Sequence, residues 1–263
     1  MVELKKLSPS RASDFQNCPL LFRYRTIDRL PEPPSIDALR GTLIHETLEK
    51  IFDLASVDRT QESANTIWHS IFDNLNEEDS SILVDLFESK QEFIESSTRL
   101  LSTYFSVENP QLLEPSGREI HIEHEGQEGL HLHGIIDRLD STTDGKIRIV
   151  DYKTGKSPRS GYEQKALFQL KFYSLILWKS TGVVPSMLRI IYLGDGTIIE
   201  HVPSVHDLEI AEKKIIQIWR TIEECIARKE FPPKKSALCG WCNHQKYCPE
   251  FGGEILPFPS SQE

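Results

Sequence analysis

An acid and an amine stand two residues apart in the sequence VDYKTGK, residues 150–156, directly after an apolar stretch. Side chains alternate between the two faces of a strand, so Asp151 and Lys153 should share one face and Tyr152 should point to the other. The pair could be a simple ion pair or half of a metal site. For an isolated Asp-x-Lys triplet the ion pair is the better interpretation.

A second carboxylate, Asp137, lies in the strand-like stretch before it, GLHLHGIIDRLD. If the two stretches pair antiparallel, Asp137 comes close to Asp151. Two neighbouring carboxylates need a cation to offset their repulsion, and oxygen ligands select Mg²⁺ or Mn²⁺. A divalent ion can activate water and stabilise a phosphoryl transition state, while a lysine orients the water or neutralises charge. The set is therefore workable for phosphodiester hydrolysis.

Three cysteines lie in CGWCNHQKYC, residues 239–248, and Cys-x2-Cys spacing lets two thiolates reach one metal centre. Cys18, 221 residues before Cys239 and followed by a proline, is the candidate fourth ligand and would tie the chain ends together. Four thiolates suit zinc or an iron–sulfur cluster, His244 could replace one of them at zinc, and the spacing does not decide. Cys225 falls in an apolar helical pattern, which indicates a core thiol.

Two further histidines, His131 and His133, precede Asp137 in the same strand-like stretch. They fit either a histidine-rich metal site or a half-exposed sheet face. The sheet face is the simpler interpretation.

The elements that must position these residues follow from periodicity and turn signals. Alternating polarity predicts a three-stranded meander and a further hairpin, over residues 118–125, 129–140, 146–153, 187–193 and 197–202. Helical spacing predicts helices over residues 10–27, 36–54, 162–180 and 206–230. Two or three more helices are expected between residues 61 and 107, one of them on Leu83, Leu86 and Phe87. This order predicts an α+β or mixed α/β domain with a mixed sheet.

The composition is that of an ordinary globular protein: 263 residues, 38% hydrophobic and 27% charged. No apolar run approaches the roughly 20 residues of a membrane span, and the N-terminus lacks the apolar segment of a signal peptide. We therefore expect a cytoplasmic protein with no membrane partner, whose five cysteines are metal ligands or free thiols. A single domain over residues 1–263 is expected.

The net charge of −10 argues mildly against a nucleic-acid partner, but its distribution weakens that argument. Residues 46–115 hold 15 acidic and four basic side chains, which fits a solvated acidic helical insertion at about residues 55–115. The chain ends are basic, with six bases and three acids in residues 1–30 and five bases and two acids in residues 226–250. The total charge therefore does not exclude DNA.

Five motifs, taken in order, resemble the RecB-like branch of the PD-(D/E)XK nucleases. They are most similar to its iron–sulfur members, the nuclease module of AddB and the CRISPR-associated exonucleases of the same type. The motifs are GTLIH (41–45), GIIDRLD (134–140), VDYKTGK (150–156), QLKFY (169–173), and Cys18 with CGWCNHQKYC (239–248). Each motif is weak alone, but their order is specific, and the resemblance runs from Cys18 to Cys248. Ile136 stands where the family name has a proline.

The resemblance implies a restriction-endonuclease-like core, a central mixed sheet flanked by helices. It implies that Mg²⁺ or Mn²⁺ is bound by His45, Asp137, Asp151 and the backbone carbonyl of Tyr152. Lys153 would then be catalytic.

The remaining implied roles concern the support of this site and a second metal centre. Gln169 and Tyr173, four apart on one helix face, would support the active site or contact DNA. Glu119, on the strand before Asp137, is an additional candidate acid. The four cysteines Cys18, Cys239, Cys242 and Cys248 match the ligands of a [4Fe-4S] cluster, which now favours iron–sulfur over zinc.

The function that the resemblance implies is that of a metal-dependent DNA exonuclease. Single-stranded ends would be its substrate, DNA repair or recombination its setting, and a helicase or a CRISPR protein its partner. Two alternatives stay open: a catalytically idle iron–sulfur DNA-binding subunit of a helicase–nuclease complex, and a nuclease of CRISPR spacer acquisition. The intact set of His45, Asp137, Asp151 and Lys153 speaks against the idle subunit.

Overall fold

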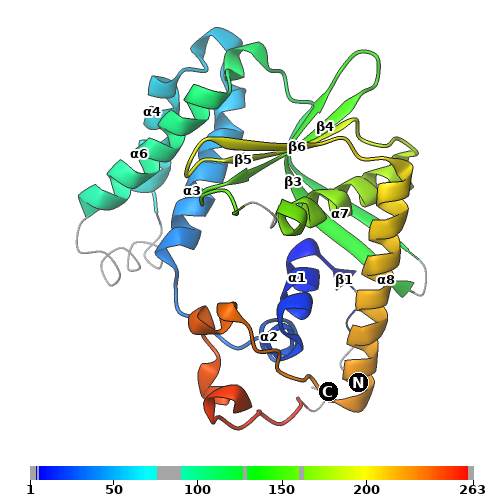
Figure 1. Cartoon of the computed structure of the whole chain (residues 1–263). Coiled ribbons are helices and arrows are strands. Elements are labelled where there is room, and N and C mark those ends of the chain that lie inside the picture. The colour runs from blue at the N-terminus through cyan, green and yellow to red at the C-terminus, as the bar shows by residue number, and fades with distance from the viewer. Residues whose placement is uncertain (1–3, 5, 76–89, 127–128, 160–162, 260–263) are drawn as a thin grey trace.

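A six-stranded mixed sheet forms the centre of the computed structural model, which describes residues 4, 6–75, 90–126, 129–159 and 163–259 (Figure 1). Its strands are β1 (Lys6–Leu7), β2 (Gly117–Glu125), β3 (His131–Ser141), β4 (Ile147–Lys153), β5 (Met187–Tyr192) and β6 (Thr197–His201). The predicted meander is confirmed, since β2, β3 and β4 pair antiparallel, and so is the β5–β6 hairpin. Parallel pairs β4–β5 and β1–β3 make the sheet mixed, as the resemblance implies.

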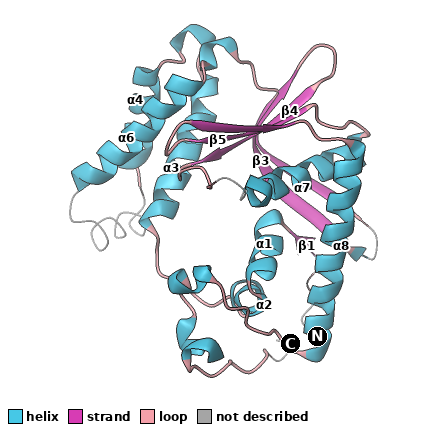
Figure 2. Cartoon of the chain, viewed as in Figure 1, coloured by secondary structure: helices cyan, strands magenta, loops and turns pink. Residues whose placement is uncertain are grey.

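Helices cover both faces of this sheet (Figure 2). They are α1 (Pro9–Asn17), α2 (Pro19–Phe22), α3 (Ile36–Lys50), α4 (Gln61–Asp73), α6 (Lys90–Val107), α7 (Glu163–Thr181) and α8 (Val205–Arg228). One hydrophobic core packs α1, α2, α7 and α8 on the sheet, and a second packs α3, α4 and α6 on its other face. Because the side chains of β4 alternate, Ile149 belongs to the first core and Val150 and Tyr152 to the second.

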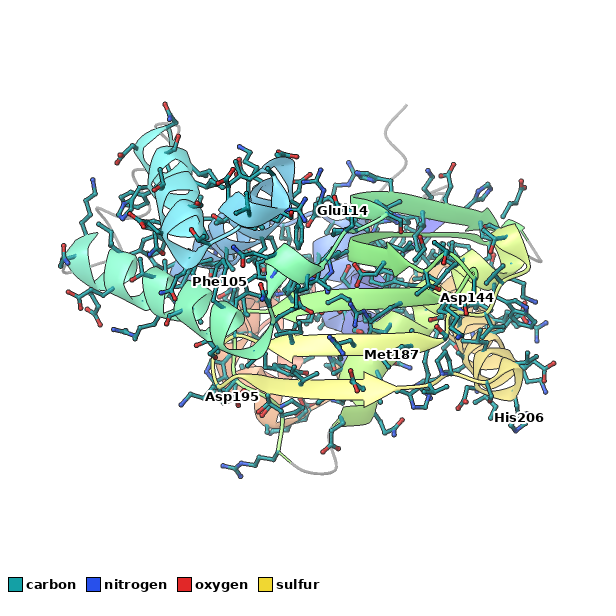
Figure 3. The ribbon with its side chains drawn as sticks, turned by 90° about the horizontal axis from the view of Figure 1, so that it is seen from above. Phe105, Glu114, Asp144, Met187, Asp195 and His206 are labelled. Carbon is teal, nitrogen blue, oxygen red and sulfur yellow. The ribbon has the colours of Figure 1, made fainter. Side chains whose placement is uncertain are left out.

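The helices of the acidic segment, α4 and α6, lie at one end of the strands (Figure 1, Figure 3). Seen from above, α6 with Phe105 lies at the end of the sheet that carries the turn of Asp195, and α8 with His206 lies at the other (Figure 3). The turn meets α6 closely, because a Cβ on Gly196 would lie 3.4 Å from Thr103 and Val107. The described part of the acidic segment is therefore packed on the sheet.

The N-terminal helical pattern is interrupted where the sequence predicted one helix over residues 10–27. Cys18 has extended backbone angles (φ −162°, ψ 115°), and α2 starts at Pro19. The proline disfavours a helical conformation at the residue before it, which ends α1. A π-helix, Arg23–Ile27, then follows α2.

Other boundaries also differ from the sequence prediction. The helix expected over residues 36–54 ends at Lys50 and continues as the 3₁₀ turn Ile51–Asp53. Strand β1 was not predicted, since two residues are too short to show a periodicity. The pattern of Leu83, Leu86 and Phe87 lies outside the described residues.

The two ends of the chain meet through side chains of the π-helix region. The buried Arg23 donates hydrogen bonds of 2.7 Å to the carbonyls of both Leu256 and Pro257, and Tyr24 donates one of 2.8 Å to the carbonyl of Tyr247. These contacts hold the cysteine-bearing C-terminal segment against the π-helix.

Candidate active site

Strands β3 and β4 separate at a fork, and the two predicted aspartates flank it. The last paired residues are Arg138 and Val150, so Asp137 and Asp151 come directly after the pairing ends. The Tyr152 N–H donates to Asp137 Oδ2 at 2.7 Å, so a side chain replaces the missing strand partner. A buried backbone N–H that has no hydrogen bond to a neighbouring strand needs another partner. The predicted antiparallel pairing is therefore confirmed. Because the pairing stops at this point, the two carboxylates lie together at the fork instead of within a regular ladder.

Asp151 and Lys153 share one face, as strand alternation predicted. Lys153 Nζ lies 2.8 Å from Asp151 Oδ2 and donates to Gln169 Oε1 at 3.0 Å. Gln169 Nε2 donates to Asp151 Oδ1 at 2.8 Å and to the Tyr173 hydroxyl at 2.9 Å. The Asp-x-Lys and Gln-x3-Tyr motifs therefore form one network, in which α7 orients the carboxylate and the amine.

A glycine on β3 explains why that network fits the sheet. A Cβ on Gly134 would lie 2.4 Å from the ring of Tyr173, closer than any real contact. Only the absence of a side chain lets Tyr173 pack against β3 at this point. The glycine of GIIDRLD and the tyrosine of QLKFY therefore pack directly against each other.

His45 on α3 reaches the same fork from the face of the sheet opposite to α7. Its Nδ1 lies 3.5 Å from Asp137 Oδ2 and 3.8 Å from Glu119 Oε1, and its Nε2 lies 3.1 Å from the Tyr152 carbonyl oxygen. Within the described ranges, His45, Glu119 and Asp137 form the one group of three whose ligand atoms all lie within 4.8 Å. Carboxylate and imidazole ligands of this kind could hold a divalent metal.

Burial and charge shape the protonation of the site. Burial, together with the neighbouring Asp151 carboxylate, raises the pKa of Asp137 to about 7. Burial opposes the charge of His45, but the carboxylates of Glu119, Asp137 and Asp151 outweigh it and raise its pKa. Burial also opposes the charge of Lys153, and Asp151 outweighs it in the same way, so the pKa of Lys153 is raised. Excess negative charge is thus concentrated at a point that a cation would stabilise.

Glu119 reaches this group through an unusual backbone conformation. It has φ of +45° and lies opposite Asp137, because Arg118 pairs with Arg138 and Ile120 with Ile136. Residues other than glycine rarely adopt positive φ, and such strain concentrates at functional sites. The antiparallel register therefore places Glu119 beside Asp137, and the positive φ is a local irregularity within β2.

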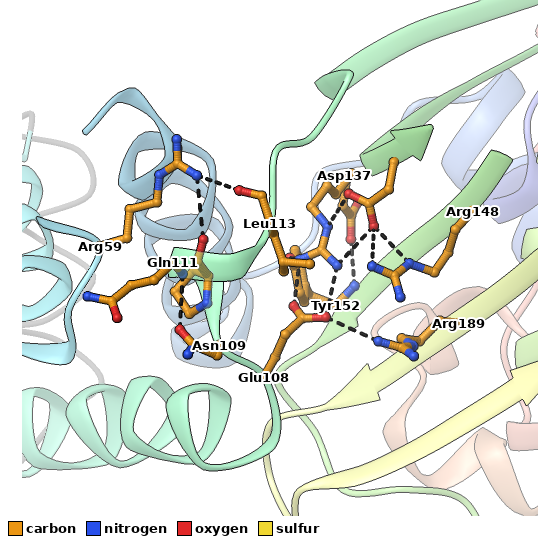
Figure 4. Close-up of polar contacts among 12 residues, drawn as sticks. Arg59, Glu108, Asn109, Gln111, Leu113, Asp137, Arg148, Tyr152 and Arg189 are labelled. Atoms are coloured by element: carbon orange, nitrogen blue, oxygen red, sulfur yellow. Dashed lines mark hydrogen bonds and ion pairs between the residues drawn. The ribbon is translucent and has the colours of Figure 1, made fainter. Parts of the chain in front are cut away.

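The back of the fork is filled by a buried ion-pair network that the sequence did not reveal (Figure 4). Arg138, 1% exposed, donates to Glu108 at 2.5 and 2.9 Å and to the Tyr152 hydroxyl at 2.6 Å. Asp140 binds both Arg138 and Arg148. The Tyr152 ring is therefore fixed on one face of β4 while its carbonyl faces His45. Glu108, one residue past α6, binds Arg138 of β3 and Arg189 of β5 and so links that helix to the sheet.

We expect Glu108→Gln to lower the free energy of unfolding by about 3 kcal/mol, because it leaves Arg138 buried without its main counter-charge. Burial alone would raise the pKa of Glu108, but Arg138 outweighs it and lowers that pKa. Urea unfolding, read as a shift in midpoint with unchanged slope, measures the loss. Glu114→Gln is the matched control: Glu114 also binds an arginine through both oxygens, but it is 79% exposed, and the buried Arg59 keeps its hydrogen bonds to the carbonyls of Leu54 and Leu113, so the change should be smaller. Equal shifts would contradict this.

The four cysteines of the predicted cluster line one cavity of about 260 Å³, hereafter the cysteine pocket. Burial, and then the neighbouring thiols of Cys18, Cys242 and Cys239, raise the pKa of Cys248. His244 also lines the pocket, but its Nε2 lies 2.9 Å from Glu32 Oε1.

The remaining residues singled out in the sequence lie elsewhere. His131 Nε2 lies 3.7 Å from Glu125, and neither His131 nor His133 belongs to the group of close metal-ligating atoms found among the described residues. Cys225, on α8, is half-buried against the first core and does not line the cysteine pocket.

Comparisons with known proteins agree with this geometry. The PD-(D/E)XK nuclease superfamily model matches residues 6–249. The chain is 28% identical over 158 residues to a subunit of the ATP-dependent helicase/deoxyribonuclease of Streptococcus mutans, a match covering 57% of this chain but only 14% of that relative. It is 23% identical over 281 residues to the Gene 69 protein of Mycobacterium phage D29, covering 95% and 98% of the two.

A solved structure shares the fold at low identity. A candidate exonuclease from Eubacterium rectale superposes with a TM-score of 0.56 and 15% identity, covering 98% of this chain and 91% of that protein. Within the described ranges, no helix is long and apolar enough to cross a membrane. The family model spans most of the sequence, and the mixed sheet with its fork at Asp137 and Asp151 fits it, so this chain belongs to the PD-(D/E)XK nuclease superfamily.

Proposed function

We propose that this chain is a Mg²⁺- or Mn²⁺-dependent DNA exonuclease that acts on single-stranded ends in DNA repair or recombination. The observation that carries the proposal is the fork, which gathers Asp137, Asp151 and Lys153 on adjacent strand ends within reach of His45. Membership of a nuclease superfamily supports the reaction class.

The metal would be held by His45, Asp137, Asp151 and the Tyr152 carbonyl, with Glu119 as a further ligand. The residues fit a divalent cation, because burial and then the neighbouring Asp151 carboxylate raise the pKa of Asp137, and a bound cation would offset both effects. Once bound, the ion would acidify a water molecule and stabilise charge on the phosphoryl group.

Lys153 would act as a fixed positive charge beside the scissile phosphate. Its raised pKa favours the ammonium form, which can orient the attacking water and neutralise developing charge, rather than remove a proton. Gln169 would hold both Lys153 and Asp151 in place, and Tyr173 would hold Gln169. Such preorganisation lets the charges act without rearranging during the reaction.

The cysteine pocket would hold a structural [4Fe-4S] cluster bound by Cys18, Cys239, Cys242 and Cys248. At a zinc ion with Zn–S bonds of about 2.3 Å, tetrahedral geometry sets the sulfurs about 3.8 Å apart. In the described part of the chain, no three of these sulfurs converge within 4.8 Å; the four instead surround a cavity. A multi-iron cluster, which each thiolate binds at a different iron, would accept four sulfurs that line one cavity.

A helicase is the proposed partner. The Streptococcus relative is named as a subunit of a helicase/deoxyribonuclease, and the present chain matches a small part of it. An idle subunit is the less favoured alternative, because the His45, Glu119 and Asp137 group is complete.

We expect purified protein to shorten end-labelled single-stranded DNA when Mn²⁺ or Mg²⁺ is present and to leave it intact in excess EDTA. The reason is that the two fork aspartates cannot together hold a phosphate without a cation. Covalently closed circular single strands provide the control, since an exonuclease needs an end. Cleavage that survives EDTA would contradict the metal dependence, and cleavage of the circles would contradict the exonuclease assignment.

A further inference from the structure

The cysteine pocket carries an exposed aromatic patch on its rim. Trp241 is 80% exposed, whereas Trp68 and Trp219 are buried. Leu238 and Phe251, both about half exposed, line the same pocket. Tryptophan is usually well covered in folded proteins, so a side chain this exposed needs a reason.

Local structure holds Trp241 in this position. It ends the 3₁₀ turn Ala237–Trp241, in which Ser236 caps the start by accepting a hydrogen bond from the Leu238 N–H at 3.2 Å. The following residue, Cys242, belongs to the pocket wall. The indole is therefore presented from an anchored turn.

Positive charge lies beside this patch. Lys234 and Lys235 line the pocket, and Lys234 Nζ donates to the Gln16 carbonyl at 2.7 Å. Lys165, at the start of α7, contacts the side-chain oxygen of Asn17 at 3.4 Å. Within the described ranges, Lys165 and Lys234 thus have uncharged partners, while Lys235 has a loose, exposed pair at 3.5 Å from Glu250. Because two of these amines have uncharged partners and the third has only a loose ion pair, they can bind a polyanion even though the chain has a net charge of −10.

The same lysine connects the patch to the fork. Lys165 lies one turn before Gln169 on α7, a rise of about 6 Å, and Gln169 donates to Asp151. Asn17, its partner, is next to Cys18 and also lines the cysteine pocket. A strand that leaves the fork along the start of α7 therefore reaches the rim of the pocket.

We propose that the surface formed by Lys165, Lys234, Lys235 and Trp241 binds single-stranded nucleic acid, with one base stacked on the Trp241 indole. Single-strand binders combine amines that follow the phosphates with aromatic rings that stack the bases, and a duplex keeps its base faces covered. The apolar patch alone would also fit a protein partner, but the lysines with uncharged partners favour a polyanion. This inference rests on the proposed nuclease function, because it treats the surface as an extension of the path that a DNA strand takes from the fork.

The test measures binding of a fluorescein-labelled oligothymidylate of about 20 nucleotides by anisotropy, in the Lys153→Ala background so that the probe stays intact. Trp241→Ala should weaken binding about tenfold, the range seen when a base loses its stacking partner. Trp241→Phe should retain most of the affinity. Leu238→Ala, which removes an apolar side chain from the same turn, is the matched control and should change binding less than twofold.

Unchanged binding in Trp241→Ala would overturn the proposal. Equal losses in Trp241→Ala and Leu238→Ala would also overturn it, since they would indicate a general apolar surface for a protein partner. Visible absorption and the melting temperature must match the parent protein, and Trp241→Phe gives the answer if the alanine variant fails that check. Oligothymidylate bound through Trp241 by wild-type protein that cleaves nothing would contradict the nuclease function and leave this inference standing.

Discussion

Lys153→Ala is expected to lower Mn²⁺-dependent degradation of single-stranded DNA by about 100- to 1,000-fold, the range for removing one preorganised group that stabilises transition-state charge. Lys153 Nζ lies 2.8 Å from Asp151 and 3.0 Å from Gln169, so its charge is fixed before substrate arrives. The substitution also removes the positive charge that offsets the repulsion between the Asp151 and Asp137 carboxylates. Rates from end-labelled substrate, at saturating metal, measure the effect.

Lys146→Ala is the matched control for this change. Lys146 stands just before β4, at the opposite end of the strand from Lys153, and its exposed amine pairs with Asp144 at 2.8 Å. Its removal should leave the rate within twofold, because exposed pairs contribute little. Lys153 is partly exposed but its partner Asp151 is buried, so the alanine variant should unfold at a lower urea concentration than wild type, and its rate is measured without urea, where it is still folded. Activity within tenfold of wild type in a folded Lys153→Ala protein would mean that the catalytic assignment is wrong.

The sequence predicted the parts of the site that follow regular periodicity. Asp151 and Lys153 share a face because a strand alternates, and Gln169 and Tyr173 share one because a helix repeats every 3.6 residues. The antiparallel meander brought Asp137 next to Asp151 for the same reason. These relations are local, so the types and spacing of the residues were enough.

The sequence did not predict the parts that depend on irregular or distant structure. The sequence named Glu119 as a candidate acid, but it did not predict the positive φ of that residue. Arg138 looked like one more charge in a strand, yet it is buried because Glu108, 30 residues away, folds back on it. The break at Cys18 was visible in Pro19, but helical spacing predicted one helix over residues 10–27. Periodicity predicts which face of an element a side chain occupies, but it does not predict which distant residues contact that side chain.

Cys18→Ala is expected to lose the proposed cluster and to lower the free energy of unfolding by up to about 5 kcal/mol. Cys18 and Cys239 are 221 residues apart, and closing a loop of that length in the unfolded chain is worth about this much. A metal centre that forms only in the folded protein contributes its binding energy to folding. The bonds of Arg23 to Leu256 and Pro257 stay, so the ends should remain in contact and the loss should fall below the full value.

Cys225→Ala separates the role of the pocket from that of any cysteine. Cys225 is half-buried on α8 and lies outside the cysteine pocket, so its removal should cost little stability and leave the visible absorption intact. Wild-type protein should be brown with broad visible absorption, and Cys18→Ala should be colourless with a lower urea midpoint. If wild-type protein is colourless and binds zinc, the cluster assignment is wrong. If Cys18→Ala keeps both its colour and its midpoint, the fourth ligand is another residue, and contacts such as those of Arg23 and Tyr24, which do not depend on the thiol, hold the chain ends together.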